Sequence, residues 1–215
     1  MNENLDRLNS LLPLAENQHR LEATLRELHR KILQGFAVHG CPPSREEMAT
    51  CLGDTPVDAA LQQLASDDLV VLSPDRQEVA GAYPFTMDER VHTVSVNGHQ
   101  SHAMCALDAL SVAPMFNATT TVKSRCHVTG DPVEVGMRGE TVLSVSPGQP
   151  WVGIRWQGTS GCAAQSLCLD MVFLRDRATA EGWQSQDSGN ISILDLPSAV
   201  VMGAAFFRPL MEQGS

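Results

Sequence analysis

Hydrophobic residues recur at helical spacing through the first third of the chain. Leu21, Leu25, Leu28 and Ile32 follow one another at intervals of four, three and four residues. This spacing places them on one face of an amphipathic helix. A shorter leucine stripe precedes it. The pattern therefore predicts a helical N-terminal region.

Capping and turn signals divide the rest of this region. Ser44-Arg-Glu-Glu47 has the pattern of a capping box and predicts a short helix that ends near Leu52. A second helix is predicted over Pro56–Ser66, and the residues from Leu69 to Phe85 predict a β-hairpin. Helix, short helix, turn, helix and hairpin in this order resemble a winged helix-turn-helix.

The charge of this module argues against DNA binding. Between Cys41 and Ala80 there are two basic and eight acidic residues, and the would-be recognition helix contains neither Lys nor Arg. A helix in the major groove must approach two phosphate backbones, which would repel this one. The winged-helix-like module is therefore expected to serve packing.

From Tyr83 onward, short β-rich runs alternate with turn signals, and Asn97-Gly98 is typical of a type I′ hairpin. The predicted hairpins are Val91–Val96 with the segment after Gly98, Thr119–Val128 with Val133–Met137, and Thr141–Val145 with Trp151–Trp156. Leu167–Leu174 is predicted to be a central strand, and helices are expected over Ala103–Leu110, Thr179–Gln184 and Pro197–Met211. The expected fold class is α+β: a winged-helix-like helical module over residues 1–82, then an antiparallel sheet domain with a few helices over residues 83–215.

Composition narrows the cellular setting. The chain of 215 residues carries a formal net charge of −10, which is unfavourable for sequence-independent nucleic-acid binding. Its first residues are polar, and no apolar stretch is long enough to span a membrane. These features predict a cytoplasmic protein whose six cysteines are reduced. There is no CxxC pair, so a closed structural zinc site is not supported.

The segment Met104-Cys105-Ala-Leu-Asp108-Ala-Leu110 contains the most informative chemistry. In a helix, Cys105 and Asp108 lie one turn apart on one face. A thiol near a helix N-terminus is expected to ionise more easily, and a neighbouring carboxylate can accept or return its proton. Apolar surroundings should raise the pKa of Asp108, so that it acts as an acid near neutral pH.

Soft-metal chemistry requires a second thiol. Cys162 lies in a Gly-rich loop, whereas Cys168 lies at the head of the predicted central strand, where a ligand is held more rigidly. Cys126 is expected to be structural, and Cys41 and Cys51 are expected to be packing residues of the helical module. The residues alone leave both Cys162 and Cys168 as possible partners of Cys105.

These motifs resemble the signature of the bacterial organomercurial lyases (alkylmercury lyases). The resemblance begins at Met104–Leu110, continues through Ser124–Gly130 and Ser166-Leu-Cys168, and extends to Ala178–Trp183. The winged-helix-like module also fits that family, in which it does not bind DNA. One departure is Met104, where members often carry a tryptophan; a soft, apolar thioether is a tolerable replacement.

The resemblance implies a role for each matching residue. Cys105 and Cys168 correspond to the two catalytic cysteines and Asp108 to the catalytic aspartate, and the three hold the Hg(II) product. Cys126 matches a cysteine usually taken as structural. The reaction implied is protonolysis of the carbon–mercury bond, which gives a hydrocarbon and Hg(II). No organic cofactor is implied; low-molecular-weight thiols are co-reactants, and a mercuric reductase is a plausible acceptor of the metal.

The substrates carry alkyl or aryl groups, so an apolar pocket is expected beside the thiols. The candidate lining residues are Leu107, Leu110, Val112, Met115 and Phe116. Three other functions fit the same cysteines: a metal-responsive winged-helix regulator, a thiol redox protein with a Cys105–Cys168 disulfide, and a mercury-binding protein without turnover. The redox alternative leaves Asp108 without a task.

Overall fold

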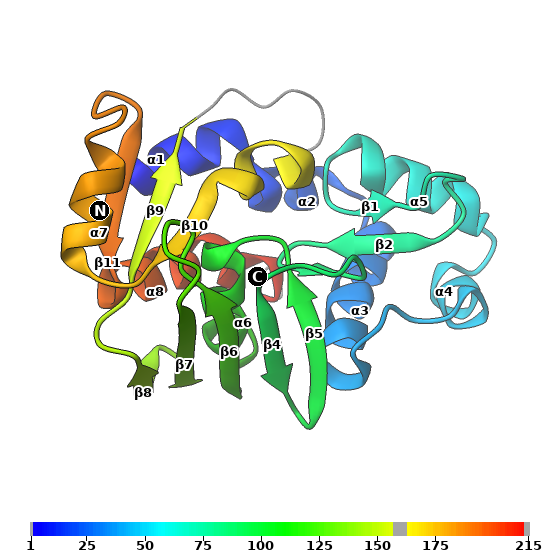
Figure 1. The fold of residues 1–215 in the computed structure, drawn as a ribbon. Coiled ribbons are helices and arrows are strands. Elements are labelled where there is room, and N and C mark those ends of the chain that lie inside the picture. Colours follow the sequence, from blue (N-terminus) through cyan, green and yellow to red (C-terminus); the bar gives the residue numbers. More distant parts are fainter. Residues whose placement is uncertain (1, 157–162, 213–215) are drawn as a thin grey trace.

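Two antiparallel sheets and a set of helices form the fold (Figure 1). The computed structural model describes residues 2–156 and 163–212. Within these residues, the larger sheet has eight strands in the order β1-β2-β3-β5-β4-β6-β7-β8, and the smaller has three in the order β10-β9-β11. The coarse prediction of helices combined with a large antiparallel sheet is therefore confirmed.

The helices are α1 (Asn2–Leu11), α2 (Leu14–Arg20), α3 (Ala23–His39), α4 (Arg45–Leu52), α5 (Val57–Ser66), α6 (Ala106–Phe116), α7 (Arg177–Gln184) and α8 (Leu196–Phe207). The strands are β1 (Val71–Leu72), β2 (Val79–Ala82), β3 (Phe85–Thr86), β4 (Thr93–Val96), β5 (His99–Ala103), β6 (Thr119–Arg125), β7 (Pro132–Arg138), β8 (Thr141–Ser146), β9 (Trp151–Arg155), β10 (Met171–Leu174) and β11 (Ile191–Asp195). Short 3₁₀ turns are η1 (Ala163–Gln165), η2 (Leu167–Asp170) and η3 (Arg208–Leu210).

The N-terminal helices follow the hydrophobic pattern closely. Leu28 and Ile32 of α3 are fully buried. The capping box at the start of α4 is present: the Ser44 hydroxyl accepts from the Glu47 amide, and the Glu47 carboxylate accepts from the Ser44 amide at 2.8 Å. Helix α5 buries Leu61, and β1 and β2 form the predicted hairpin.

This hairpin continues into the main sheet. Strand β3 pairs with β2 on one side and with β5 on the other, so the sheet runs across residues 82 and 83. One hydrophobic cluster likewise contains residues from both sides, such as Phe36 and Phe85, whose stacked rings lie 5.4 Å apart. The winged-helix assignment of residues 1–82 stays a prediction.

Two further predicted hairpins are confirmed. Asn97 and Gly98, between β4 and β5, have φ angles of 51° and 84°, as a turn with two left-handed residues requires. Strands β6 and β7 pair antiparallel along their whole length.

The third predicted hairpin, Thr141–Val145 with Trp151–Trp156, is wrong. Strand β8 pairs with β7 at the edge of the large sheet, whereas β9 is the middle strand of the small one. The burial of the two strands explains this separation. Strand β8 is mostly exposed, but Val152, Gly153 and Ile154 of β9 are all buried and need cover on both faces.

The predicted central strand Leu167–Leu174 is also wrong. Its first four residues form η2, and only Met171–Leu174 form a strand, at an edge of the small sheet. A short apolar run fits a buried helical turn as well as a buried strand, and periodicity cannot separate the two.

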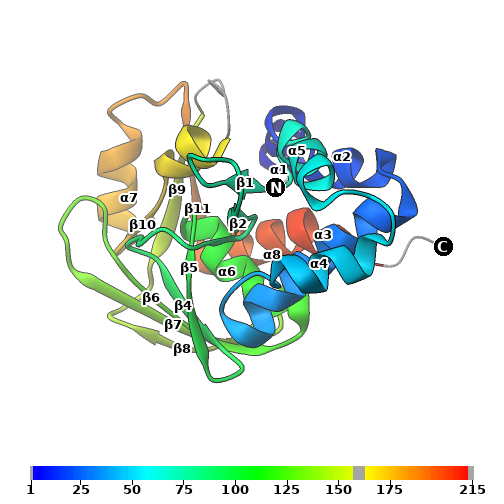
Figure 2. The same cartoon turned by 90° about the vertical axis from the view of Figure 1, so that its right-hand side faces the viewer.

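The helix expected over Ala103–Leu110 starts later and extends further. Ala103 ends β5, Cys105 caps the helix, and α6 runs to Phe116. Helix α6 packs between the large sheet and α8 (Figure 2). Helix α8, capped by Asp195, ends at Phe207 before Pro209 rather than at Met211. The helix predicted over Thr179–Gln184 is α7.

In the described ranges, no helix is both long enough and hydrophobic enough to cross a bilayer. The cytoplasmic location stays a prediction.

Candidate active site

Three groups from two distant parts of the chain converge at one buried point. The Sγ atoms of Cys105 and Cys168 and a carboxylate oxygen of Asp108 all lie within 4.8 Å of one another, and all three residues are buried. Two sulfurs at this separation can bind one soft ion between them, with a carboxyl group beside them.

Cys105 is held by the start of α6. It is the N-cap residue, with an extended backbone (φ −152°, ψ 178°), and its Sγ accepts a hydrogen bond from the Asp108 amide at 3.3 Å. A capping side chain satisfies an amide that the helix cannot. Asp108 lies in the first turn, so the cap and the acid share one turn although Cys105 itself is outside the helix.

Cys168 lies on η2, the short turn before β10, and not in the strand that the sequence predicts. Met171, the first residue of β10, places its thioether sulfur 3.7 Å from the Cys105 Sγ. The two thiol segments therefore meet in a buried, sulfur-rich contact.

Burial keeps both thiols neutral. It raises the pKa of Cys105 well above its ordinary value, and the hydrogen bond with Cys168 and the charge of Asp108 raise it further. The hydrogen bond with Cys105 lowers the pKa of Cys168, but burial and the charge of Asp108 outweigh it, so that pKa is raised too. The expectation that Cys105 ionises more easily at the helix N-terminus is wrong, because removal from water outweighs the helix dipole.

Asp108 behaves as the sequence predicts. Burial raises its pKa from 3.8 to about 7, although its hydrogen bonds with Cys105 act in the opposite direction. Its Oδ2 atom is buried and has no hydrogen-bond partner among the residues that the structure describes. The carboxyl group can therefore hold or release a proton near neutral pH, beside both sulfurs.

A cavity of about 320 Å³ reaches Cys168. Its apolar wall consists of Met104, Leu169, Val172 and Phe173, and Arg90 and Arg125 contribute charge. The cavity thus has an apolar surface next to the thiol of Cys168.

The lining residues predicted from the sequence are not those of this cavity. Leu107, Leu110, Val112 and Met115 are buried in the core, and Phe116 packs against it. They belong to α6, whose apolar surface faces the sheet and α8, so their hydrophobicity reflects packing.

Comparison with known proteins assigns the family. The family model "MerB: Alkylmercury lyase" matches residues 85–208. The chain belongs to the alkylmercury lyase family. An alkylmercury lyase from Pseudomonas putida is 29% identical over 181 residues, 81% of this chain and 81% of the relative. One from Bacillus cereus is 28% identical over 180 residues, 84% of this chain and 80% of the relative.

A solved structure has the same fold. It is described as "Crystal structure of the mercury-bound form of MerB2", with a TM-score of 0.78 and 20% identity, and the match covers 93% of this chain and 98% of that one. As a member of the family, the protein is an enzyme, a carbon–mercury lyase.

The other cysteines of this lyase have varied settings. Cys126 is buried just after β6 and also lines the cavity. Burial raises its pKa, but hydrogen bonds from Thr129 and nearby amides outweigh this, and the pKa is lowered. Its structural role stays a prediction. Cys51 is half-buried and packs against the core, as expected. Cys162 lies outside the described residues.

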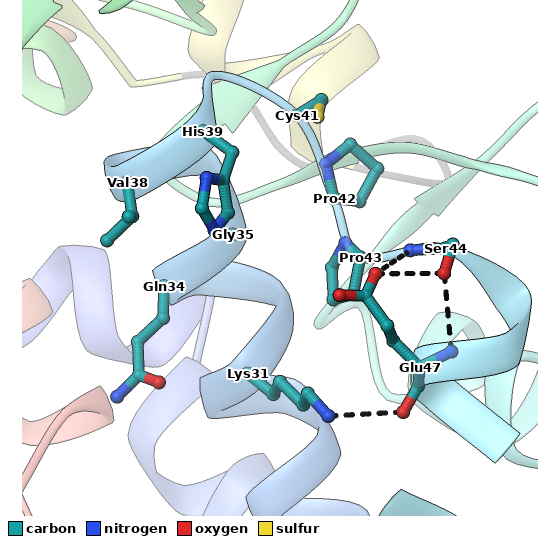
Figure 3. Close-up of a pocket in the computed structure, with 10 residues that line it drawn as sticks. All are labelled: Lys31, Gln34, Gly35, Val38, His39, Cys41, Pro42, Pro43, Ser44 and Glu47. Atoms are coloured by element: carbon teal, nitrogen blue, oxygen red, sulfur yellow. Dashed lines mark hydrogen bonds between the residues drawn. The ribbon is translucent and has the colours of Figure 1, made fainter. Parts of the chain in front are cut away.

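Cys41 differs from its prediction as a packing residue. It is exposed and lines a separate hollow of about 600 Å³ between α3 and α4, where Lys31 donates to the Glu47 backbone oxygen (Figure 3). The hollow includes neither Cys105 nor Cys168.

Sequence reasoning missed several groups around the site. Met171 touches Cys105, and His92 lines the cavity in a buried, neutral state, because burial lowers its pKa to about 4. Tyr83 and Asp68 contact the segment that carries Cys168. None belongs to a motif, and only the folded chain brings them to the site.

Proposed function

We propose that Cys105, Cys168 and Asp108 carry out the carbon–mercury cleavage of this lyase. The observation that supports this assignment is the convergence of the two sulfurs and the carboxyl oxygen within 4.8 Å in a buried site. Mercury prefers sulfur ligands, and two of them lie at one point. The substrate is an alkyl- or arylmercury compound that arrives bound to a low-molecular-weight thiol.

The protons balance without a cofactor. As mercury binds the first sulfur, the Asp108 carboxylate takes that thiol's proton. The second enzyme thiol displaces the incoming thiol, which leaves with the second proton. Asp108 then gives its proton to carbon, and the carbon–mercury electron pair forms the new C–H bond. The products are a hydrocarbon, a free thiol and Hg(II) held by two thiolates, and Asp108 is again a carboxylate.

Each step relies on a property of the site described above. Two thiolate ligands donate electron density to mercury and make the attached carbon more basic. A carboxylic acid with a pKa of about 7 is protonated often enough to serve as the donor, and its conjugate base is abundant enough to accept the thiol proton. Its position beside the sulfurs removes the search for a proton in solvent.

The cavity beside Cys168 is proposed to hold the organic group. Leu169, Val172 and Phe173 supply an apolar wall for an alkyl or aryl substituent. Met104, in the same wall, precedes Cys105 directly.

The proposal also assigns roles to the two parts of the chain and a route for the Hg(II) product. Residues 83–215 form the catalytic unit, and residues 1–82 form a module that does not bind DNA. Hg(II), held by Cys105 and Cys168 with Asp108 beside them, leaves through exchange with free thiols or to a mercuric reductase.

The test is methane release from methylmercury in the presence of excess thiol. Cys105→Ser and Cys168→Ser should each reduce turnover at least a thousandfold, because a serine hydroxyl is a poor ligand for a soft metal. Cys41→Ser, which changes an exposed cysteine of the separate hollow, should keep wild-type turnover. Full activity in either site variant, or mercury binding without methane in the wild type, would refute the assignment.

A further inference from the structure

We propose that Tyr83 and Asp68 are positioning residues that hold Cys168 within reach of Cys105. The inference rests on the proposed role of Cys168. It gives Asp68 of the N-terminal module, together with Tyr83 at the start of the catalytic unit, a direct part in building the active site. Neither residue belongs to the signature motifs.

Hydrogen bonds connect these two side chains to the backbone before Cys168. The Tyr83 hydroxyl accepts from the Ala164 amide at 2.8 Å and donates to Asp68 Oδ1 at 3.2 Å. Asp68 Oδ2 accepts from the Ala163 amide at 3.3 Å. The pair therefore holds two consecutive amides at the start of η1, and Cys168 follows four residues after Ala164.

The positions of Asp68 and Tyr83 in the fold explain how they contact the segment that carries Cys168. Asp68 lies in the turn between α5 and β1, and Tyr83 lies between β2 and β3. Figures 1 and 2 both place the 163–170 segment beside the hairpin that follows α5. Tyr83 is buried, with 1% of its surface exposed, so its ring gives the hydroxyl a fixed position.

The backbone hydrogen bonds within this segment each span a single turn. The Ser166 amide bonds to Ala163, and the Leu169 amide bonds to Ser166. Such single turns do not fix their own position in the molecule, whereas β-ladder bonds begin only at Met171. That position is set by the burial of Leu167 in the core and, before it in the chain, by the hydrogen bonds of Ala163 and Ala164 with Asp68 and Tyr83.

The backbone conformation of Asp68 suits its positioning role and allows a conservative substitution. Its φ of 54° is in the left-handed region, which Asp and Asn adopt more readily than other residues with a side chain. Asp68→Asn therefore keeps the turn and removes one charged acceptor. Tyr83→Phe keeps the ring and removes only the hydroxyl.

The experiment measures turnover and the reactivity of each cysteine. In Tyr83→Phe and Asp68→Asn, kcat with methylmercury should fall roughly tenfold, the value of one or two lost hydrogen bonds. Alkylation by iodoacetamide, resolved by peptide mass spectrometry, should become at least tenfold faster at Cys168 than in the wild type, with a smaller change at Cys105. Asp67→Asn is the matched control, because the Asp67 side chain accepts from Gln63 next to the same turn.

The outcomes separate this inference from the proposed function. If Cys168→Ser abolishes turnover but Tyr83→Phe leaves both turnover and Cys168 alkylation unchanged, the positioning role is wrong and the catalytic assignment stands. Equal acceleration at Cys105 and Cys168 shows general loosening and also refutes the positioning role. If Cys168→Ser is fully active, the catalytic assignment itself fails.

Discussion

The two thiols of the site are held in different ways. Cys105 caps α6, a helix enclosed by the large sheet and α8, and its sulfur is bonded to that helix's own amide. Cys168 lies on a 3₁₀ turn whose preceding residues are hydrogen-bonded to side chains from a distant part of the chain. One sulfur is fixed by local structure and the other by distant contacts.

This difference indicates which half of the site depends on distant contacts. A metal that binds two sulfurs needs a defined separation between them, and the proposed thiol-bound substrate carries one ligand that can be exchanged. Cys105 and its acid are held by one helix, whereas the position of Cys168 depends on core packing and on hydrogen bonds from a distant part of the chain. In the proposed mechanism, proton transfer belongs to the half that contains Cys105 and Asp108.

The largest expected effect tests the proposed role of Asp108 in proton transfer. Asp108→Asn should lower turnover by about 10²- to 10⁴-fold, the usual contribution of a positioned proton donor, and should weaken Hg(II) binding far less. In the wild type, kcat/KM should rise with pH up to about 7 and then level, because the free enzyme must present the carboxylate. The measurements are methane release across pH and Hg(II) titration.

Two observations control this experiment. The asparagine variant should lose the inflection near pH 7; equal losses of binding and turnover would instead make Asp108 a ligand only.

The Asp108→Asn variant should also have a higher Tm than the wild type at pH 8. The folded-state pKa is raised from 3.8 to about 7, so stability in the wild type is lost as pH rises through that window, and the difference should vanish below about pH 4.

An intermediate effect tests the firmness of the Cys105 helix. A Cβ added at Gly203 of α8 would collide with the Ser111 hydroxyl and contact Leu107 of α6. Gly203→Ala should therefore destabilise the fold by about 1–3 kcal/mol, measured by urea unfolding. Gly182→Ala in α7, where an added Cβ meets nothing within 4 Å, is the matched control and should not destabilise. Equal stability of the two variants would show that α6 and α8 are not tightly packed.

The smallest effect concerns Met171, where the two thiol segments meet. Met171→Leu nearly conserves volume, so stability should change by less than about 1.5 kcal/mol. Turnover and Hg(II) affinity should change less than about threefold, because a neutral thioether is a weaker ligand than a thiolate. A tenfold loss of affinity by competitive titration would make Met171 a third sulfur ligand and would weaken the contrast between the two halves.

Much of the local structure could be predicted from the sequence. The Ser44 capping box, the Asn97-Gly98 turn and the leucine stripe of α3 each depend on neighbouring residues, so their physics is contained in a short window. The thiol and acid of the Cys105 turn were predictable for the same reason, as was the raised pKa of Asp108, which needs only an apolar setting.

The wrong predictions concern structure that depends on contacts between residues far apart in the sequence. Strand β9 pairs in the small sheet and not with β8, and residues Leu167–Asp170 form a 3₁₀ turn before β10. In both cases the local sequence allows either structure, and the partners available in the folded chain decide between them. Burial then reversed the expected acidity of Cys105.

By itself, the sequence determined many of the local elements and the resemblance to the family, and it named Cys105, Asp108 and Cys168 as candidates, because short-range spacing and side-chain chemistry encode them. Only the tertiary structure decided how Cys168 reaches Cys105, which residues surround the cavity and which groups stay neutral. Those properties depend on desolvation and on hydrogen bonds between residues far apart in the chain, such as Asp68 and Ala163.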